Sequence, residues 1–182
     1  MGAIKRNRPS GASDFVVYSL GSATVILMAD RAAVIAPPPL LVLLCIAAGA
    51  IVDHFKPFPI IRDFAFVPRV AISITILLIA SGLVFTAIRQ FRAHHEHPNP
   101  YQPTNAIVSS GIYRFTRNPI YAGFMIVVIA AAIGFNSFWV LLSIIPLFLL
   151  LQLGVVLREE TYLSTKFGAP YDDYRRRVRR WF

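Results

Sequence analysis

The chain has 182 residues, of which 56% are hydrophobic and 15% charged, and its mean hydropathy is +0.60. This composition excludes an ordinary soluble domain and indicates a single compact integral membrane protein. The net charge is +9. With four spans and both termini in the cytoplasm, 15 of the 18 Lys and Arg residues would lie on the cytoplasmic side, as the positive-inside rule expects. The rule accounts for the basic charge, so we expect no nucleic-acid partner.

The N-terminal segment precedes the first confident membrane span. Residues 1–13 are basic and contain Pro and Gly, so we expect a disordered tail there. The apolar stretch 15–29 would reach about 22 Å as a helix, which is short of the roughly 30 Å hydrocarbon core. It is predicted as an interfacial or tilted helix, and the sequence does not decide whether it crosses the bilayer. A signal peptide is disfavoured because no small-x-small cleavage site follows.

Four further apolar stretches predict membrane-spanning helices. The first opens at Pro37-Pro38-Pro39 and is extended N-terminally through 34–36, and the third is only fourteen residues long. The spans are 34–52, 70–88, 120–133 and 138–157. The predicted fold is therefore all-α, a polytopic membrane bundle of about four transmembrane helices with interfacial N- and C-terminal helices.

The organisation predicted from these stretches is one integral-membrane domain covering residues 1–182. Residues 1–33 form its tail and interfacial helix, 34–97 its first two spans, and 98–182 a hairpin followed by a C-terminal tail. The outer turn of the hairpin is uncharged, so the loop before it and the tail after it should emerge on the same side of the membrane.

The central loop contains a cluster of potential metal ligands, His94, His95, Glu96 and His97. A metal or heme-linked role is one interpretation, but no further ligand is evident downstream and no metal site is assigned. Three prolines follow within the next six residues. They favour a stiff, extended strap across the cytoplasmic mouth of the bundle.

The segment GIYRFTRNPIYAG, residues 111–123, runs from a polar loop into an apolar helix. Asn118 followed by Pro119 is typical of a helix start, and a helix N-terminus is favourable for anions. Arg114 and Arg117 can converge there, and Gly123 would let a ligand approach the backbone. The alternative is an ordinary positive-inside flank with interfacial tyrosines.

A second polar motif follows the last span. Its acidic pair Glu159-Glu160 lies at the membrane boundary and should meet cations, with Arg114 and Arg117 as the candidates. Gly168 and Pro170 predict a helix end and a new helix start. Residues Tyr171, Tyr174, Val178 and Trp181 then share one face of a basic amphipathic helix, which we expect to lie on an anionic leaflet.

In combination, GIYRFTRNPIYAG and EE-x-x-L-x-x-x-FG-x-x-Y-x-x-Y-x-x-x-V resemble the isoprenylcysteine carboxyl methyltransferase family and its relatives, the phospholipid N-methyltransferases, and suggest a prokaryotic member. The resemblance covers a little under half of the chain. It implies an all-helical membrane methyltransferase that binds S-adenosylmethionine on the cytoplasmic side without a Rossmann domain, in agreement with the absence of G-x-G-x-x-G from the sequence.

The resemblance also implies the site residues. The cofactor would be bound by Tyr113, Arg117, Asn118, Pro119, Tyr121, Gly123, Glu159, Glu160, Tyr171 and Tyr174. Many family members have His where Asn118 stands. Members that methylate carboxylates carry an Arg about one turn before the acidic pair, where this chain has Val155 and Val156. That departure weakens the case for a prenylcysteine carboxylate.

Methyl transfer from a sulfonium mainly requires alignment and exclusion of water. Arg158, Arg175 or Arg179 would orient an anionic acceptor, whereas for an amine Glu159 or Glu160 would take the proton. The expected partners are membrane lipids and a lipidic or prenylated acceptor, with no obligate protein partner, in the bacterial inner membrane. A membrane NADPH-dependent reductase of the sterol-reductase type and a non-catalytic scaffold are the alternatives. The acceptor and the oligomeric state stay open.

Overall fold

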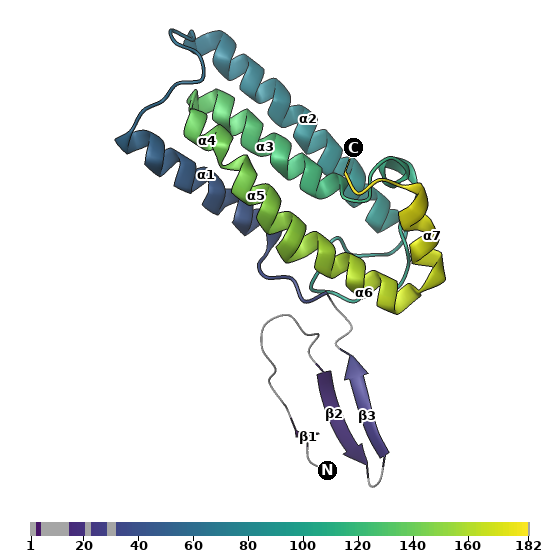
Figure 1. The fold of residues 1–182 in the computed structure, drawn as a ribbon. Helices are drawn as coiled ribbons and strands as arrows, with labels where there is room; N and C mark the ends of the chain where they lie inside the picture. Colours follow the sequence, from purple (N-terminus) through teal and green to yellow (C-terminus); the bar gives the residue numbers. More distant parts are fainter. Residues whose placement is uncertain (1–2, 5–14, 21–22, 29–31, 182) are drawn as a thin grey trace.

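The computed structural model describes residues 3–4, 15–20, 23–28 and 32–181, and from Pro38 onward it shows an all-α membrane bundle. Its helices α1 (Pro38–Phe55), α2 (Phe66–Ala93) and α3 (Pro119–Phe135) are followed by a longer helical run from Phe138 to Phe167, and each of these runs antiparallel to the one before it in the sequence (Figure 1). Within the described residues, α1, α2 and the last run are long and apolar enough to cross a membrane, and α3 is a shorter apolar helix.

The last helical run changes its winding along its length. It comprises α4 (Phe138–Leu142), α5 (Ile144–Leu151), a π-helical turn η2 (Gln152–Val156) and α6 (Leu157–Phe167). The π-turn lies immediately before the turn that carries the acidic pair. Such wider turns are rare inside helices and occur frequently at functional sites.

Proline and glycine set several helix ends. The prediction that 34–36 extend the first helix is wrong: α1 begins at Pro38, since the residue before a proline is driven out of the helical region and Pro37 has ψ 122°. Helix α3 begins at Pro119 as predicted. Gly168 has φ 61° and separates α6 from α7 (Ala169–Arg177), also as predicted.

The predicted N-terminal interfacial helix is wrong for the residues described. Strands β2 (Phe15–Leu20) and β3 (Ala23–Met28) pair antiparallel, and β1 (Ala3–Ile4) pairs with β2. Both longer strands are rich in β-branched residues, which favour extended backbone, and Gly21-Ser22 lies between them in the sequence. Most of the expected disordered tail lies outside the described residues.

The core of the bundle lies among α1, α3 and α5. Its fully buried members on α3 and α5 include Val128, Leu147 and Leu151. Helix α2 packs against α3 through small residues: Ala80 and Ala87 are fully buried, and the Ser73 hydroxyl donates to the Ala130 carbonyl at 2.8 Å. Small residues of this kind permit the close helix approach that lipid surroundings require.

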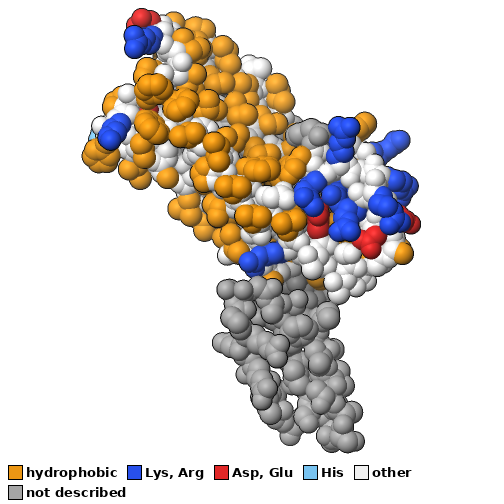
Figure 2. Space-filling model, in the orientation of Figure 1, with side chains coloured by type: hydrophobic (Ala, Val, Ile, Leu, Met, Phe, Trp, Pro, Cys, Tyr) orange, Lys and Arg blue, Asp and Glu red, His pale blue; other side chains and the backbone are white. Residues whose placement is uncertain are grey.

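The two ends of the bundle differ in chemistry. At one end the start of α4 meets the loop between α1 and α2: the Trp139 indole donates to the Lys56 carbonyl at 2.7 Å, and the Phe138 amide donates to the Phe58 carbonyl at 2.9 Å. The opposite end gathers the C-terminus of α2, the N-terminus of α3, and α6 and α7 (Figure 1). Hydrophobic side chains cover the body between them, and Lys and Arg side chains crowd the α7 end (Figure 2).

The C-terminal tail does not continue as one amphipathic helix. Helix α7 ends at Arg177, and Val178 is extended with φ −116° and ψ 133°. Arg179 then forms a parallel bridge with Thr116. The Trp181 ring lies 5.4 Å from Phe148, so the predicted single face through Trp181 is wrong and the tail folds back onto the bundle.

Candidate active site

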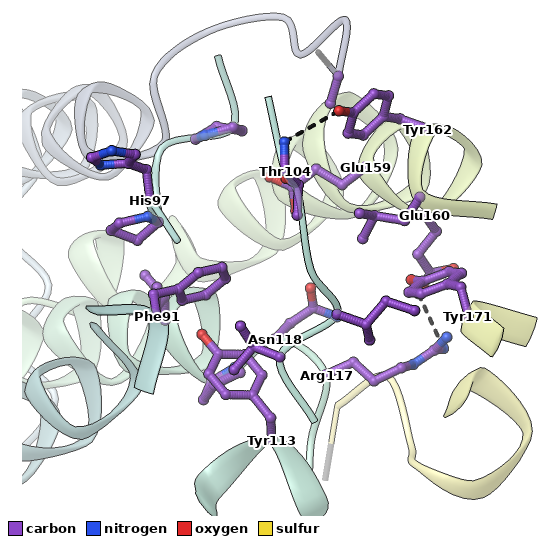
Figure 3. A pocket seen from close by; sticks show the side chains of 18 of the residues that line it. Phe91, His97, Thr104, Tyr113, Arg117, Asn118, Glu159, Glu160, Tyr162 and Tyr171 are labelled. Atoms are coloured by element: carbon purple, nitrogen blue, oxygen red, sulfur yellow. Dashed lines mark hydrogen bonds and ion pairs between the residues drawn. The ribbon is translucent and has the colours of Figure 1, made fainter. Parts of the chain in front are cut away.

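An open cavity lies at the α7 end of the bundle. Its walls come from the end of α2, the loop before α3, the start of α3, α6 and α7, together with Ala32 before α1. It contains charged groups on one side and mainly apolar or proline residues on the other. Figure 3 shows Phe91 and His97 on one side and Arg117, Glu160 and Tyr171 on the other.

Glu160 is the buried anchor of the charged side, and its side chain is only 7% exposed. The Arg180 guanidinium donates to both of its carboxylate oxygens, from Nε at 2.9 Å and from Nη2 at 2.8 Å. Nη2 of Arg117 lies 3.0 Å from the same carboxylate. The hydrogen bond to Glu160 raises the pKa of Arg180, which therefore stays charged. One carboxylate thus joins α6, the start of α3 and the C-terminal tail.

Arg117 has hydrogen-bond donors that the ion pair with Glu160 does not use. Its side chain is 8% exposed, and its Nε and Nη1 atoms are buried with no hydrogen-bond partner among the residues that the structure describes. Leaving buried charged donors unpaired is costly, and a planar guanidinium is suited to hold a carboxylate or phosphate with two N–H groups. Because Arg117 lines the cavity, these donors provide a site for an anionic group of a ligand.

Glu159 is the second carboxylate of the cavity, and its partners differ from those of Glu160. One of its oxygens accepts a hydrogen bond of 2.6 Å from the Tyr121 hydroxyl, and both residues line the cavity. Across the described part of the chain, no Lys or Arg forms an ion pair with Glu159. A half-buried carboxylate without a cation favours a positively charged ligand group.

Three tyrosines enclose the remaining polar side of the cavity. The Tyr174 hydroxyl donates to the Tyr113 carbonyl at 2.9 Å, which ties α7 to the loop before α3. The ring of Tyr171 lies 6.1 Å from that of Tyr174. Burial raises the pKa of Tyr171 to about 12, so this side chain remains a neutral hydroxyl at physiological pH.

Asn118 occupies the position before α3 but does not cap the helix with its side chain. Its Nδ2 donates instead to the Arg180 carbonyl at 2.9 Å, and the Thr116 hydroxyl donates to the same carbonyl at 3.2 Å. Asn118 is therefore the N-cap residue by position, and the helix begins where predicted, but its side chain makes no capping hydrogen bond. The asparagine fixes the C-terminal tail against the loop before α3.

The cavity brings together most of the residues implied for cofactor binding. Those that line it are Tyr113, Arg117, Asn118, Pro119, Tyr121, Glu159, Glu160, Tyr171 and Tyr174. Gly123 does not: a Cβ there would lie 2.4 Å from Cγ2 of Val84, so this glycine permits close packing of α3 against α2 rather than approach of a ligand.

The arginines expected to orient an anionic acceptor lie outside the lining. Arg158 donates to the Ala33 carbonyl at 2.7 Å, Arg175 is half-exposed beside Asp172 at 3.6 Å, and Arg179 is exposed. The prediction that the acidic pair meets Arg117 is confirmed. Arg114 is exposed, and the second arginine that pairs with Glu160 is Arg180.

Sequence reasoning missed Arg180, Tyr162 and Phe91. Phe91 packs edge-on against Tyr113 with ring centroids 5.4 Å apart. A signal existed only for Tyr162, which falls three residues after Glu159 and therefore on a neighbouring face of the helix. Among the described residues no group of three or more His, Cys, Asp or Glu could hold a metal ion. His94 instead contacts the Gln90 carbonyl at 2.8 Å, and His97 lines the cavity.

Two comparisons with known proteins bear on this site. A family model described as phospholipid methyltransferase matches residues 68–170, which is more than half of the chain. An uncharacterized protein of Haemophilus influenzae is 32% identical over 62 residues, covering 34% of this chain and 98% of that protein. The matched range contains the cavity residues from α2 to α6 but not α7 beyond its first two residues.

Proposed function

The chain belongs to the phospholipid methyltransferase family, and from this premise we propose that it is an S-adenosylmethionine-dependent enzyme that methylates an amine of a membrane lipid. The observation that carries the proposal is the pair of unmet charges in one cavity. Within the part of the chain that the structure describes, Arg117 presents two unpartnered donor atoms, and Glu159 presents a carboxylate without a cation.

The cavity residues suit the cofactor's charge pattern. S-adenosylmethionine carries a carboxylate together with an ammonium and a sulfonium, and when bound it supplies an electrophilic methyl group. Arg117 would hold the carboxylate through its free Nε and Nη1, while Glu160 keeps the guanidinium in place. Tyr171 and Tyr174 would cover this side and exclude water.

The arrangement supports an amine rather than a carboxylate acceptor. Arg158, Arg175 and Arg179 lie outside the cavity lining, so a second anion would lack a cation of its own. Glu159 can instead orient an amine and take the proton that the nitrogen loses as its bond to carbon forms. The Tyr121 hydroxyl holds one carboxylate oxygen at 2.6 Å and leaves the other for this task.

The site lies at the basic end of a membrane protein (Figure 2). Under the positive-inside rule we infer that this end faces the cytoplasm, and four passes would put the segment before α1 and the tail after α7 on that side. We place the enzyme in the bacterial inner membrane, where the cofactor arrives from the cytoplasm and a lipid from the bilayer.

Titration calorimetry on the detergent-solubilised protein tests the cofactor site. Arg117→Lys keeps a cation for Glu160 but removes the guanidinium fork, so affinity for S-adenosylmethionine should fall about tenfold to a hundredfold. Arg114→Lys is the matched control from the same loop, where the side chain is exposed, and should bind as the wild type does. Equal affinity of all three proteins would overturn the assigned site, and a wild type that does not bind would overturn the activity.

The acceptor is tested with labelled methyl groups in vesicles. Vesicles with phosphatidylethanolamine should become labelled on the lipid amine, while a prenylcysteine carboxylate should not. Glu159→Gln keeps the size and the hydrogen bond to Tyr121 but weakens the base, so turnover should drop about 10²-fold or more. Labelling of the carboxylate alone would contradict the amine assignment.

A further inference from the structure

The loop between α2 and the motif before α3 contains an eight-residue strap, residues 97–104, that forms one wall of the cavity. Its lining residues are His97, Pro98, Asn99, Pro100 and Thr104. The strap contains a hydrogen-bonded turn. The Asn99 side-chain oxygen accepts from the Tyr101 amide at 3.0 Å, and the Asn99 backbone carbonyl accepts from the Gln102 amide at 3.1 Å. Together with three prolines, this turn restricts the shapes that the strap can take.

Glu96 joins the two ends of the strap. It is 5% exposed, and both carboxylate oxygens lie 3.0 Å from the backbone nitrogen of Asn105. Its own amide donates to the Phe91 carbonyl at 2.9 Å, which fixes it to the end of α2. Among the described residues, this buried carboxylate accepts from a single backbone amide. A buried carboxylate with so few donors is costly to keep unless closing the loop is useful.

The far end of the strap is also held. The Thr104 amide donates to the Tyr162 hydroxyl at 3.3 Å, and Tyr162 belongs to α6, the helix that carries Glu159 and Glu160. Figure 3 shows this contact as a dashed line across the upper rim of the cavity. The strap is therefore closed on itself by Glu96 and attached to the opposite side by Tyr162.

We propose that Glu96 is a positioning residue for the methyl acceptor: it closes the strap so that residues 97–104 form the wall against which the acceptor lies. This inference rests on the proposed function. The Arg117–Glu160 pair that suits the cofactor lies on the opposite side, just before α3 and on α6 (Figure 3). The strap side, with Phe91, Pro98 and Pro100, offers apolar surface that suits a lipid.

Hydrogen exchange tests the closure without any ligand. In the full-length protein, Glu96→Ala should speed exchange of the 97–105 peptide about tenfold. Glu96→Gln retains an oxygen that can accept from Asn105 and should restore slow exchange, whereas Glu96→Asp keeps the charge but lacks the reach. Arg92→Ala, at an exposed position one turn earlier, is the control. Unchanged exchange in Glu96→Ala would overturn the closure.

Kinetics then separate positioning from general support. Glu96→Ala should raise KM for phosphatidylethanolamine about tenfold, leave the Kd for S-adenosylmethionine within about twofold, and be rescued by Glu96→Gln. A parallel loss of cofactor affinity would overturn the role in acceptor positioning. If the wild type binds no cofactor, the proposed function fails, and the exchange experiment still decides whether Glu96 closes the strap.

Discussion

The two walls of the cavity are built by different means. The charged wall joins α3, α6 and the C-terminal tail through the buried carboxylate of Glu160 and its two arginines. The strap wall is one continuous loop held by backbone donors to Glu96 and Tyr162. Buried ion pairs between distant segments tie ligand binding to the integrity of the fold, whereas a closed loop can change shape while the bundle stays intact.

Removal of Glu160 should have the largest effect. Glu160→Ala leaves Arg117, whose side chain is 8% exposed, without its partner, and breaking a buried pair costs about 3–5 kcal/mol. Thermal unfolding in detergent should show a midpoint lower by about 10 °C or more, with loss of S-adenosylmethionine binding. Thr161→Ala, an adjacent exposed position, is the control. A Glu160→Ala protein of normal stability would show that the charged wall is not structural.

A substitution in the body should affect stability alone. In Gly123→Ala the new Cβ would lie 2.4 Å from Val84, and crowding of this kind costs about 1–3 kcal/mol. Gly82→Ala is the matched control, since a Cβ there meets nothing within 4 Å. The unfolding midpoint should fall only for Gly123→Ala, with cofactor affinity per folded molecule unchanged. Reduced affinity without reduced stability would place Gly123 in the site after all.

Tyr121→Phe should change turnover more than stability. It removes the hydroxyl that holds Glu159 at 2.6 Å, so kcat should fall about fivefold through lost orientation of the base. Steady-state kinetics on vesicles measures this, with Phe124→Leu on the same helix as the comparison. An unaltered kcat would show that the Tyr121 hydroxyl does not contribute to turnover.

Arg180→Gln should have the smallest effect. Its side chain is 35% exposed, and Arg117 remains beside Glu160, so solvent screening limits the loss to about 1 kcal/mol or less. The unfolding midpoint should fall by about 2–4 °C. Arg177→Gln, at an exposed position on α7, should not change it. A loss as large as that of Glu160→Ala would mean that Arg180, not Arg117, holds the charged wall.

The sequence predicted the meeting of Arg117 with the acidic pair because that follows from the number of passes through the membrane. A hairpin returns the chain to the side it left, and Pro119 and Gly168 are local signals that do not depend on tertiary packing. Hydropathy and the helix-end signals were therefore enough to predict that these two polar motifs lie close together.

Other features depend on contacts that no local pattern encodes. Arg180 reaches Glu160 only because the tail leaves its helix after Arg177 and returns to Thr116, whereas its helical spacing suggested a continuous surface helix. Residues 15–29 form short apolar runs, for which hydrophobicity alone does not separate strand from helix. For Gly123, the sequence shows the missing side chain but not whether a ligand or Val84 takes the space.

The π-helical turn Gln152–Val156 has a consequence for how this helix can evolve. One additional residue in a turn rotates everything that follows by about 100° about the helix axis. The wider turn therefore lets the half of the helix before it and the half that carries the acidic pair face directions that a regular α-helix would not combine. A deletion of one residue there would leave the bilayer contacts in place yet swing both carboxylates away from the cavity that they line.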